Sequence, residues 1–86
     1  MHVVVSGDLV ETSIRSMMQR QASKLQVTGW VRFTEDGDVE AVYNGPETNV
    51  QAMVRWCERG PLGPRVTAVV ANPQPREAFF GFDVRK

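Results

Sequence analysis

The stretch "TGWVRFTEDGDVEA", residues 28–41, decides the fold because it contains a complete β-hairpin signal. Apolar and polar residues alternate on both sides of Asp36-Gly37, and this pair supplies the positive-φ residue that a tight turn needs. We therefore predict strands at about 27–35 and 38–44. Phe33 is the unusual residue, because a large apolar side chain stands at the end of the first strand, directly before an acidic turn.

The segments on either side of this hairpin add two helices and three strands. β-Branched residues predict a short buried strand at 2–7, and apolar residues at helical spacing predict a helix at 14–26. A second helix starts after Gly45-Pro46 and is stopped by the Gly-Pro pairs at 60–64. Further strands are predicted at 65–71 and 78–85.

The predicted order, β-α-β-β-α-β with a terminal strand, is the ferredoxin-like split βαβ arrangement. It belongs to the α+β class, with an antiparallel sheet, both helices on one face and a short C-terminal strand. A chain of 86 residues is long enough for one domain. The two halves echo each other, but neither buries a core alone, so we expect residues 1–86 to form a single domain.

Composition excludes several classes of function. Ten basic and ten acidic residues cancel, so no net field favours nucleic acid or anionic lipid. The single Cys57 rules out an internal disulfide and a multi-cysteine metal site, and we expect it to be a small buried apolar residue. No apolar run approaches the roughly 20 residues of a membrane span, and the N-terminus lacks a signal-peptide pattern. We expect a cytoplasmic monomer.

The join between the first strand and the first helix, "SGDLVETSIR" (6–15), is the most chemically suggestive segment. Backbone N–H groups without partners and the positive end of the helix dipole meet at a helix N-terminus. Arg15 adds a cation there, which is unfavourable unless an anion binds. The alternative is a solvated arginine without a ligand.

Three segments, "GDLVETSIR", "VTGWVRFTEDGDVEAVYNGP" and "WCERGPLGPRV", resemble the acylphosphatase family over nearly the whole chain. Members typically read G-R-V-Q-G-V-G-F-R at the loop and G-W-V-R-N at the strand. The resemblance implies a hydrolase that converts an acyl phosphate into a carboxylate and inorganic phosphate, without metal or cofactor. The expected ligand is a small acyl phosphate or an inorganic anion.

The resemblance also assigns roles within the site. The family's loop amides cradle the phosphate, its loop arginine binds the phosphate oxygens, and an asparagine on the second strand positions the attacking water. Arg15 stands at the position of the arginine and Phe33 at that of the asparagine. The cradle corresponds to Val10, Glu11, Thr12, Ser13 and Ile14.

Departures from the family pattern predict impaired or lost catalysis. A phenyl ring at Phe33 cannot hydrogen-bond a water as an amide does, and Thr34 points to the opposite face of the sheet. Glu11 and Ser13 replace two glycines, which strains the loop by roughly 1–2 kcal/mol per residue if those positions need positive φ. The Glu11 carboxylate also repels a phosphate, and Val10 replaces the usual glutamine.

Two alternatives stay open at this stage. The first is an active, slow acylphosphatase that uses Arg15 and the 10–15 loop, with hydroxyl donors from Thr12 and Ser13. The second is a non-catalytic module that binds an anion or a protein. The C-terminal "AFFGFDVR" also resembles an aromatic RNA-recognition strand, but that motif belongs on the third strand, so we interpret Phe79, Phe80 and Phe82 as core and edge packing.

Overall fold

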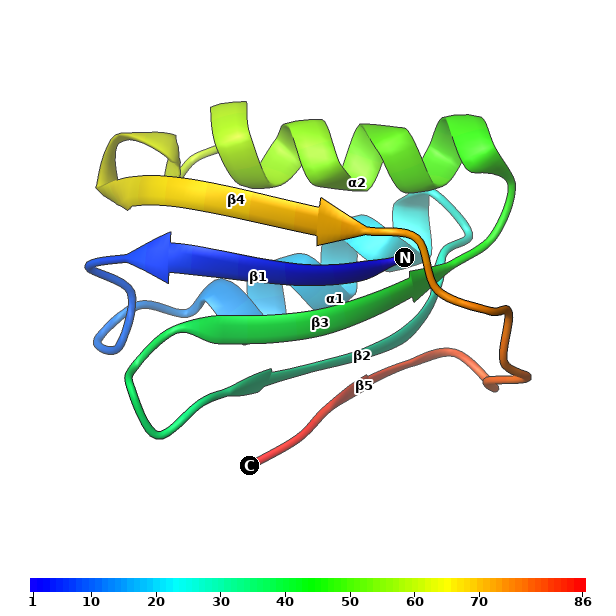
Figure 1. Cartoon of the computed structure of the whole chain (residues 1–86), viewed down its shortest axis with the longest axis horizontal. Coiled ribbons are helices and arrows are strands. Elements are labelled where there is room, and N and C mark those ends of the chain that lie inside the picture. Colours follow the sequence, from blue (N-terminus) through cyan, green and yellow to red (C-terminus); the bar gives the residue numbers. More distant parts are fainter.

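The computed structural model describes residues 1–86 and forms a two-layer α+β domain (Figure 1), as the sequence predicts. Its strands form one sheet in the order β4-β1-β3-β2-β5. The elements are β1 (His2–Gly7), α1 (Ile14–Lys24), β2 (Thr28–Phe33), β3 (Val39–Asn44), α2 (Glu47–Arg59), a 3₁₀ turn (Gly63–Arg65), β4 (Val66–Asn72) and β5 (Phe82–Val84).

The first four strands pair antiparallel, as predicted, whereas β5 pairs parallel with β2 and makes the sheet mixed. The parallel pairing follows from the path of the chain. After β4 the chain passes the end of the sheet and turns back (Figure 1), so β5 runs opposite to β4 and in the same direction as β2. The regular part of β5 is shorter than the predicted 78–85, because only Phe82–Val84 reaches the edge of β2.

The core lies between the sheet and the two helices. Tyr43 is its largest fully buried side chain, and its hydroxyl lies 3.2 Å from both Met18 Sδ and Cys57 Sγ. Burial raises the pKa of the Cys57 thiol to about 11, so this cysteine stays protonated at neutral pH and is buried, as expected. Burial likewise raises the pKa of Tyr43 well above its usual value.

The C-terminal aromatic residues divide between core and solvent. Phe82 is only 6% exposed and packs 6.0 Å from the Tyr43 ring, which agrees with the predicted core packing. The prediction was wrong for Phe80, which is fully exposed at 100%. Phe80 precedes Gly81, whose φ of 86° turns the chain just before β5 begins, and the side chain is left outside the sheet. Neither helix has the length and apolar composition that a membrane crossing requires.

Candidate anion-binding site

The site lies at the end of the sheet where the loop after β1 meets the β2–β3 hairpin turn (Figure 1). Strand register places Val5, Val39 and Phe33 side by side across this end. Val5 and Val39 are fully buried beneath the helices, while Phe33 is half-buried. Phe33 therefore ends the buried row on the inner face of the sheet, at the N-terminus of α1.

The loop after β1 is folded tightly by its own backbone. Gly7 has a φ of 153°, and a Cβ there would lie 2.1 Å from the Arg65 carbonyl oxygen, so only glycine fits. The next residue, Asp8, donates its N–H to that same oxygen at 3.0 Å. Thr12 then donates both its N–H (3.0 Å) and its hydroxyl (2.6 Å) to the Leu9 carbonyl.

The other amides of this segment have no acceptor in the protein. They are the N–H groups of Val10, Glu11, Ser13, Arg15 and Ser16, and those of the buried Leu9 and Ile14. The N-cap residue Ser13 makes no side-chain cap bond, and the first turn of α1 contains no acidic residue. A helix N-terminus that lacks both usual partners is suited to an external anion, because the amides and the helix dipole favour negative charge.

Arg15 is held beside these amides. Its Nη1 donates to the Arg85 carbonyl at 2.9 Å, and its guanidinium carbon lies 4.8 Å from the centre of the Phe33 ring. No carboxylate pairs with it, since both ion pairs in the protein involve Glu40, with His2 and with Arg32. The positive charge of Arg15 thus remains available to a ligand.

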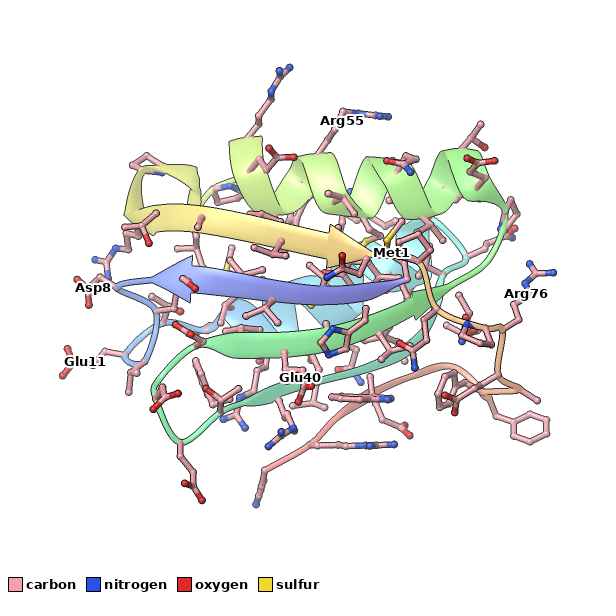
Figure 2. All side chains as sticks on the ribbon, viewed as in Figure 1. Met1, Asp8, Glu11, Glu40, Arg55 and Arg76 are labelled. Atoms are coloured by element: carbon pink, nitrogen blue, oxygen red, sulfur yellow. The ribbon has the colours of Figure 1, made fainter.

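The loop residues that depart from the family pattern are accommodated without backbone strain. Gln26 is the only non-glycine residue with positive φ, so Glu11 and Ser13 do not carry the left-handed strain that replacing a glycine can bring. Glu11 is exposed at the rim and points away from the body of the protein (Figure 2). It forms no ion pair with Arg15. The exposed residues Val10, Glu11 and Ser13 therefore keep N–H groups without partners at the surface of the loop.

Among the hydroxyl side chains of the loop only that of Ser13 has no partner in the protein, while the other hydroxyl and amide groups nearby are hydrogen-bonded or distant. Thr34 Oγ1 accepts the Asp38 N–H at 3.2 Å within the hairpin turn, and Thr12 is bonded to Leu9. Asn44 stands at the other end of β3, 6% exposed, and donates to the Glu77 carbonyl at 3.2 Å. No amide side chain takes over the position that Phe33 occupies.

The sequence did not reveal the contact between Arg15 and the Arg85 carbonyl. This contact exists because β5 adds to the edge of β2, where the Arg85 N–H donates to the Val31 carbonyl at 2.8 Å. The second α1 side chain on this side, Gln19, donates to the Phe82 carbonyl at 2.9 Å. Nothing local in the sequence marks these main-chain acceptors.

Other candidate ligand sites are less developed. No group of three or more His, Cys, Asp or Glu side chains is arranged to hold a metal ion. A hollow of about 210 Å³ lies at the opposite end of the sheet, lined in part by Met1, Asn44 and Arg76, and it does not include Arg15. The loop and Arg15 therefore form an open surface site.

These features define an α+β domain with a loop of unpaired amides at a helix N-terminus, and comparison with known proteins identifies its family. The acylphosphatase family model matches residues 1–84. The acylphosphatase of Pseudomonas paraeruginosa (strain DSM 24068 / PA7) is 38% identical over 86 residues, covering 100% of this chain and 94% of its own. That of Roseiflexus sp. (strain RS-1) is 46% identical over 84 residues, covering 96% and 90%.

A solved structure gives the same result. The acylphosphatase of Coxiella burnetii superposes with a TM-score of 0.91 at 33% identity, covering 98% of this chain and 88% of its own. The chain belongs to the acylphosphatase family.

Proposed function

We propose that this protein binds the phosphoryl group of an acyl phosphate on the amides of the 10–15 loop and on the Arg15 side chain, and that its hydrolysis of this ligand is impaired. One observation carries the proposal: Arg15, which pairs with no carboxylate, belongs to the segment whose amides are unpaired, and its guanidinium lies against the Phe33 ring. The anion-binding half of the site is present, and the water-positioning half is not.

The chemistry needs little more than donors in the right place. Water attacks the phosphorus, the bond from phosphorus to the bridging oxygen breaks, and the products are a carboxylate and inorganic phosphate. The carboxylate leaves without needing a proton, and in the transition state negative charge is spread over the three phosphoryl oxygens. Backbone N–H groups and a guanidinium stabilise that charge, and the guanidinium matches two phosphate oxygens at once.

The impairment follows from Phe33. A phenyl ring neither donates a hydrogen bond to the attacking water nor accepts one from it. Loss of a single positioned polar group in an active site lowers kcat by about 100- to 1,000-fold. Because Glu11 and Ser13 do not strain the loop backbone, we propose Phe33 as the main cause of the impaired hydrolysis.

The test is hydrolysis of acetyl phosphate by the purified protein beside three variants. Phe33→Asn restores an amide side chain and should raise the rate by at least tenfold. Phe33→Ala is the matched control, because it removes the ring without adding an amide, and its rate should stay near that of the parent. Arg15→Ala should abolish whatever hydrolysis the parent shows.

A fast parent enzyme, unchanged by Phe33→Asn, would refute the proposed impairment and show that the protein is a working acylphosphatase without an asparagine. Binding of inorganic phosphate, measured by calorimetry on the same samples, addresses the anion site separately. If the parent binds phosphate but no variant hydrolyses the substrate, the non-catalytic anion-binding alternative is favoured.

A further inference from the structure

We propose that Phe33 and Val10 form an apolar subsite for the acyl group, so that this protein selects acyl phosphates with a neutral, apolar and preferably aromatic acyl group. The proposal rests on the proposed function, since it assumes that the phosphoryl group is bound by Arg15 and the loop amides. In this proposal the Phe33 ring recognises the acyl group, at the position where the family's asparagine positions the attacking water.

The geometry of Arg15 sets where the acyl group must lie. The guanidinium stacks on the Phe33 ring, with 4.8 Å between its central carbon and the ring centre. In an acyl phosphate one bridging oxygen separates phosphorus from the acyl carbon. A phosphoryl group bound to Arg15 therefore brings the acyl substituent next to the half-buried Phe33.

Val10 supplies the second apolar surface. It is a loop residue with 61% of its surface exposed, and its own N–H is among those without an acceptor. Its Cγ2 lies 3.0 Å from the place that a Cβ on Gly37 would take, so it contacts the turn that follows Phe33. Phe33 and Val10 thus belong to the two segments, hairpin and loop, that meet at the anion site.

The charges around the site oppose a charged acyl group. The hairpin turn carries Glu35, Asp36 and Asp38, and the loop carries Asp8 and Glu11. None of these carboxylates forms an ion pair with a basic side chain. A carboxylate on the acyl group would meet the like charges of the hairpin turn, whereas a phenyl or alkyl group would cover apolar surface of Phe33 and Val10.

The experiment measures binding, so that it does not depend on hydrolysis. Phenacylphosphonate and acetonylphosphonate mimic benzoyl and acetyl phosphate, with a CH₂ group in place of the bridging oxygen. Their affinities are compared with that of inorganic phosphate by calorimetry on the full chain. We expect phenacylphosphonate to bind about tenfold more tightly than acetonylphosphonate, because its ring is removed from water.

Two variants test the residues. Phe33→Ala should reduce the preference for the phenacyl ligand to within about twofold, and Val10→Ser should reduce it by about half, since valine covers less surface than phenylalanine. Val70→Ser is the matched control. Val70 is also an exposed valine, at 52%, but lies on β4, so its replacement should leave the preference unchanged.

The outcomes separate the two proposals. Equal binding of both phosphonates, with inorganic phosphate still bound, overturns the acyl subsite and leaves the proposed function intact. A preference that persists in both Phe33→Ala and Val10→Ser also overturns it. If neither the phosphonates nor phosphate bind the parent protein, the proposed function and the subsite both fail.

Discussion

Two arginines stack on two aromatic rings on opposite faces of β2, and only one of these pairs lies at the candidate anion site. The guanidinium carbon of Arg15 lies 4.8 Å from the ring centre of Phe33 on the inner face. The guanidinium carbon of Arg85 lies 4.5 Å from the ring centre of Trp30 on the outer face. The pairs are chemically alike, but their surroundings differ. Arg15 belongs to the first turn of α1, where backbone amides are unpaired, whereas Trp30 pairs in register with Asp83.

A cation–π contact does not by itself make a binding site. Such a contact orients a guanidinium and contributes about 0.5–1 kcal/mol when exposed. Whether the guanidinium then binds an anion depends on the other donors and charges within a few ångströms. Here the backbone of the 9–16 segment makes the difference.

The two pairs are also linked through one residue. The side chain of Arg85 stacks on Trp30, while its main-chain carbonyl accepts a hydrogen bond from Arg15. Stacking on Trp30 therefore helps to hold Arg85, whose N–H is bonded to β2. The Arg85 carbonyl in turn helps to orient Arg15. The following predictions test how separate the two pairs are.

The largest expected effect comes from replacing each arginine in turn. Arg15→Ala should weaken phosphate binding by about 10- to 150-fold, because charge-assisted hydrogen bonds contribute about 1.5–3 kcal/mol. Arg85→Ala should change it less than about threefold, because the main-chain carbonyl that holds Arg15 remains. Calorimetric titration with inorganic phosphate measures both.

Arg15→Lys is the control for charge alone. Lysine keeps the positive charge but offers no planar fork to the phosphate, so its affinity should lie between those of the parent and Arg15→Ala. Equal losses in Arg15→Ala and Arg85→Ala would contradict the distinction between the two pairs and show that the anion site extends to the outer face.

The sequence predicted those features of the site that depend on local rules. The Asp36-Gly37 turn follows from turn chemistry, since Gly37 has the positive φ that the turn needs and the strands on either side of it pair as a hairpin. The hydrogen bond from Arg15 to the Arg85 carbonyl could not be predicted, because it depends on which strand edge β5 joins. That pairing involves residues more than 50 positions apart.

The loop shows a different limit. Replacing two glycines suggested strain, yet the actual φ angles at Glu11 and Ser13 are unremarkable for these residues, and no sequence pattern encodes them. The exposure of Phe80 was missed for a related reason: in "AFFGF" every aromatic has the same local preference for burial, and the turn at Gly81 decides which one enters the core.

A smaller effect is expected from the outer ring. Trp30→Ala should lower the free energy of unfolding by about 1–2 kcal/mol, because it removes the stacking on Arg85 and some buried apolar area. Phosphate affinity should change less than about threefold. Urea denaturation followed by circular dichroism measures the first, and calorimetry the second.

Trp30→Phe is the matched variant, because it keeps a ring under Arg85 and should recover most of the stability. A large loss of phosphate affinity in Trp30→Ala, with recovery in Trp30→Phe, would show that the outer stack positions Arg15 through the backbone of Arg85. The two pairs would then act as one unit.

The smallest expected effect concerns the charge network on the outer face, where Glu40 lies 2.7 Å from His2 Nε2 and 2.6 Å from Arg32 Nη2 (Figure 2). The hydrogen bond from His2, followed by the bonds and charge of Arg32, holds the pKa of Glu40 below its ordinary value of 4.5. A carboxyl group with a lower pKa in the folded state stabilises the fold above the unfolded pKa, and that contribution is lost as pH falls through the folded pKa. Stability from this network should therefore be complete at neutral pH and decline below about pH 4.5.

Glu40→Gln removes this titration. We expect it to lower the free energy of unfolding at pH 7 by less than about 1 kcal/mol, as for other partly exposed ion pairs, and to flatten the decline between pH 5 and 3. Glu35→Gln, at an exposed carboxylate without an ion pair, is the control and should follow the parent. Because Glu40 faces away from α1, phosphate affinity at pH 7 should stay equal in all three proteins. A Glu40→Gln protein with weakened phosphate binding would show that the outer face influences the anion site by a route other than the Arg85 backbone.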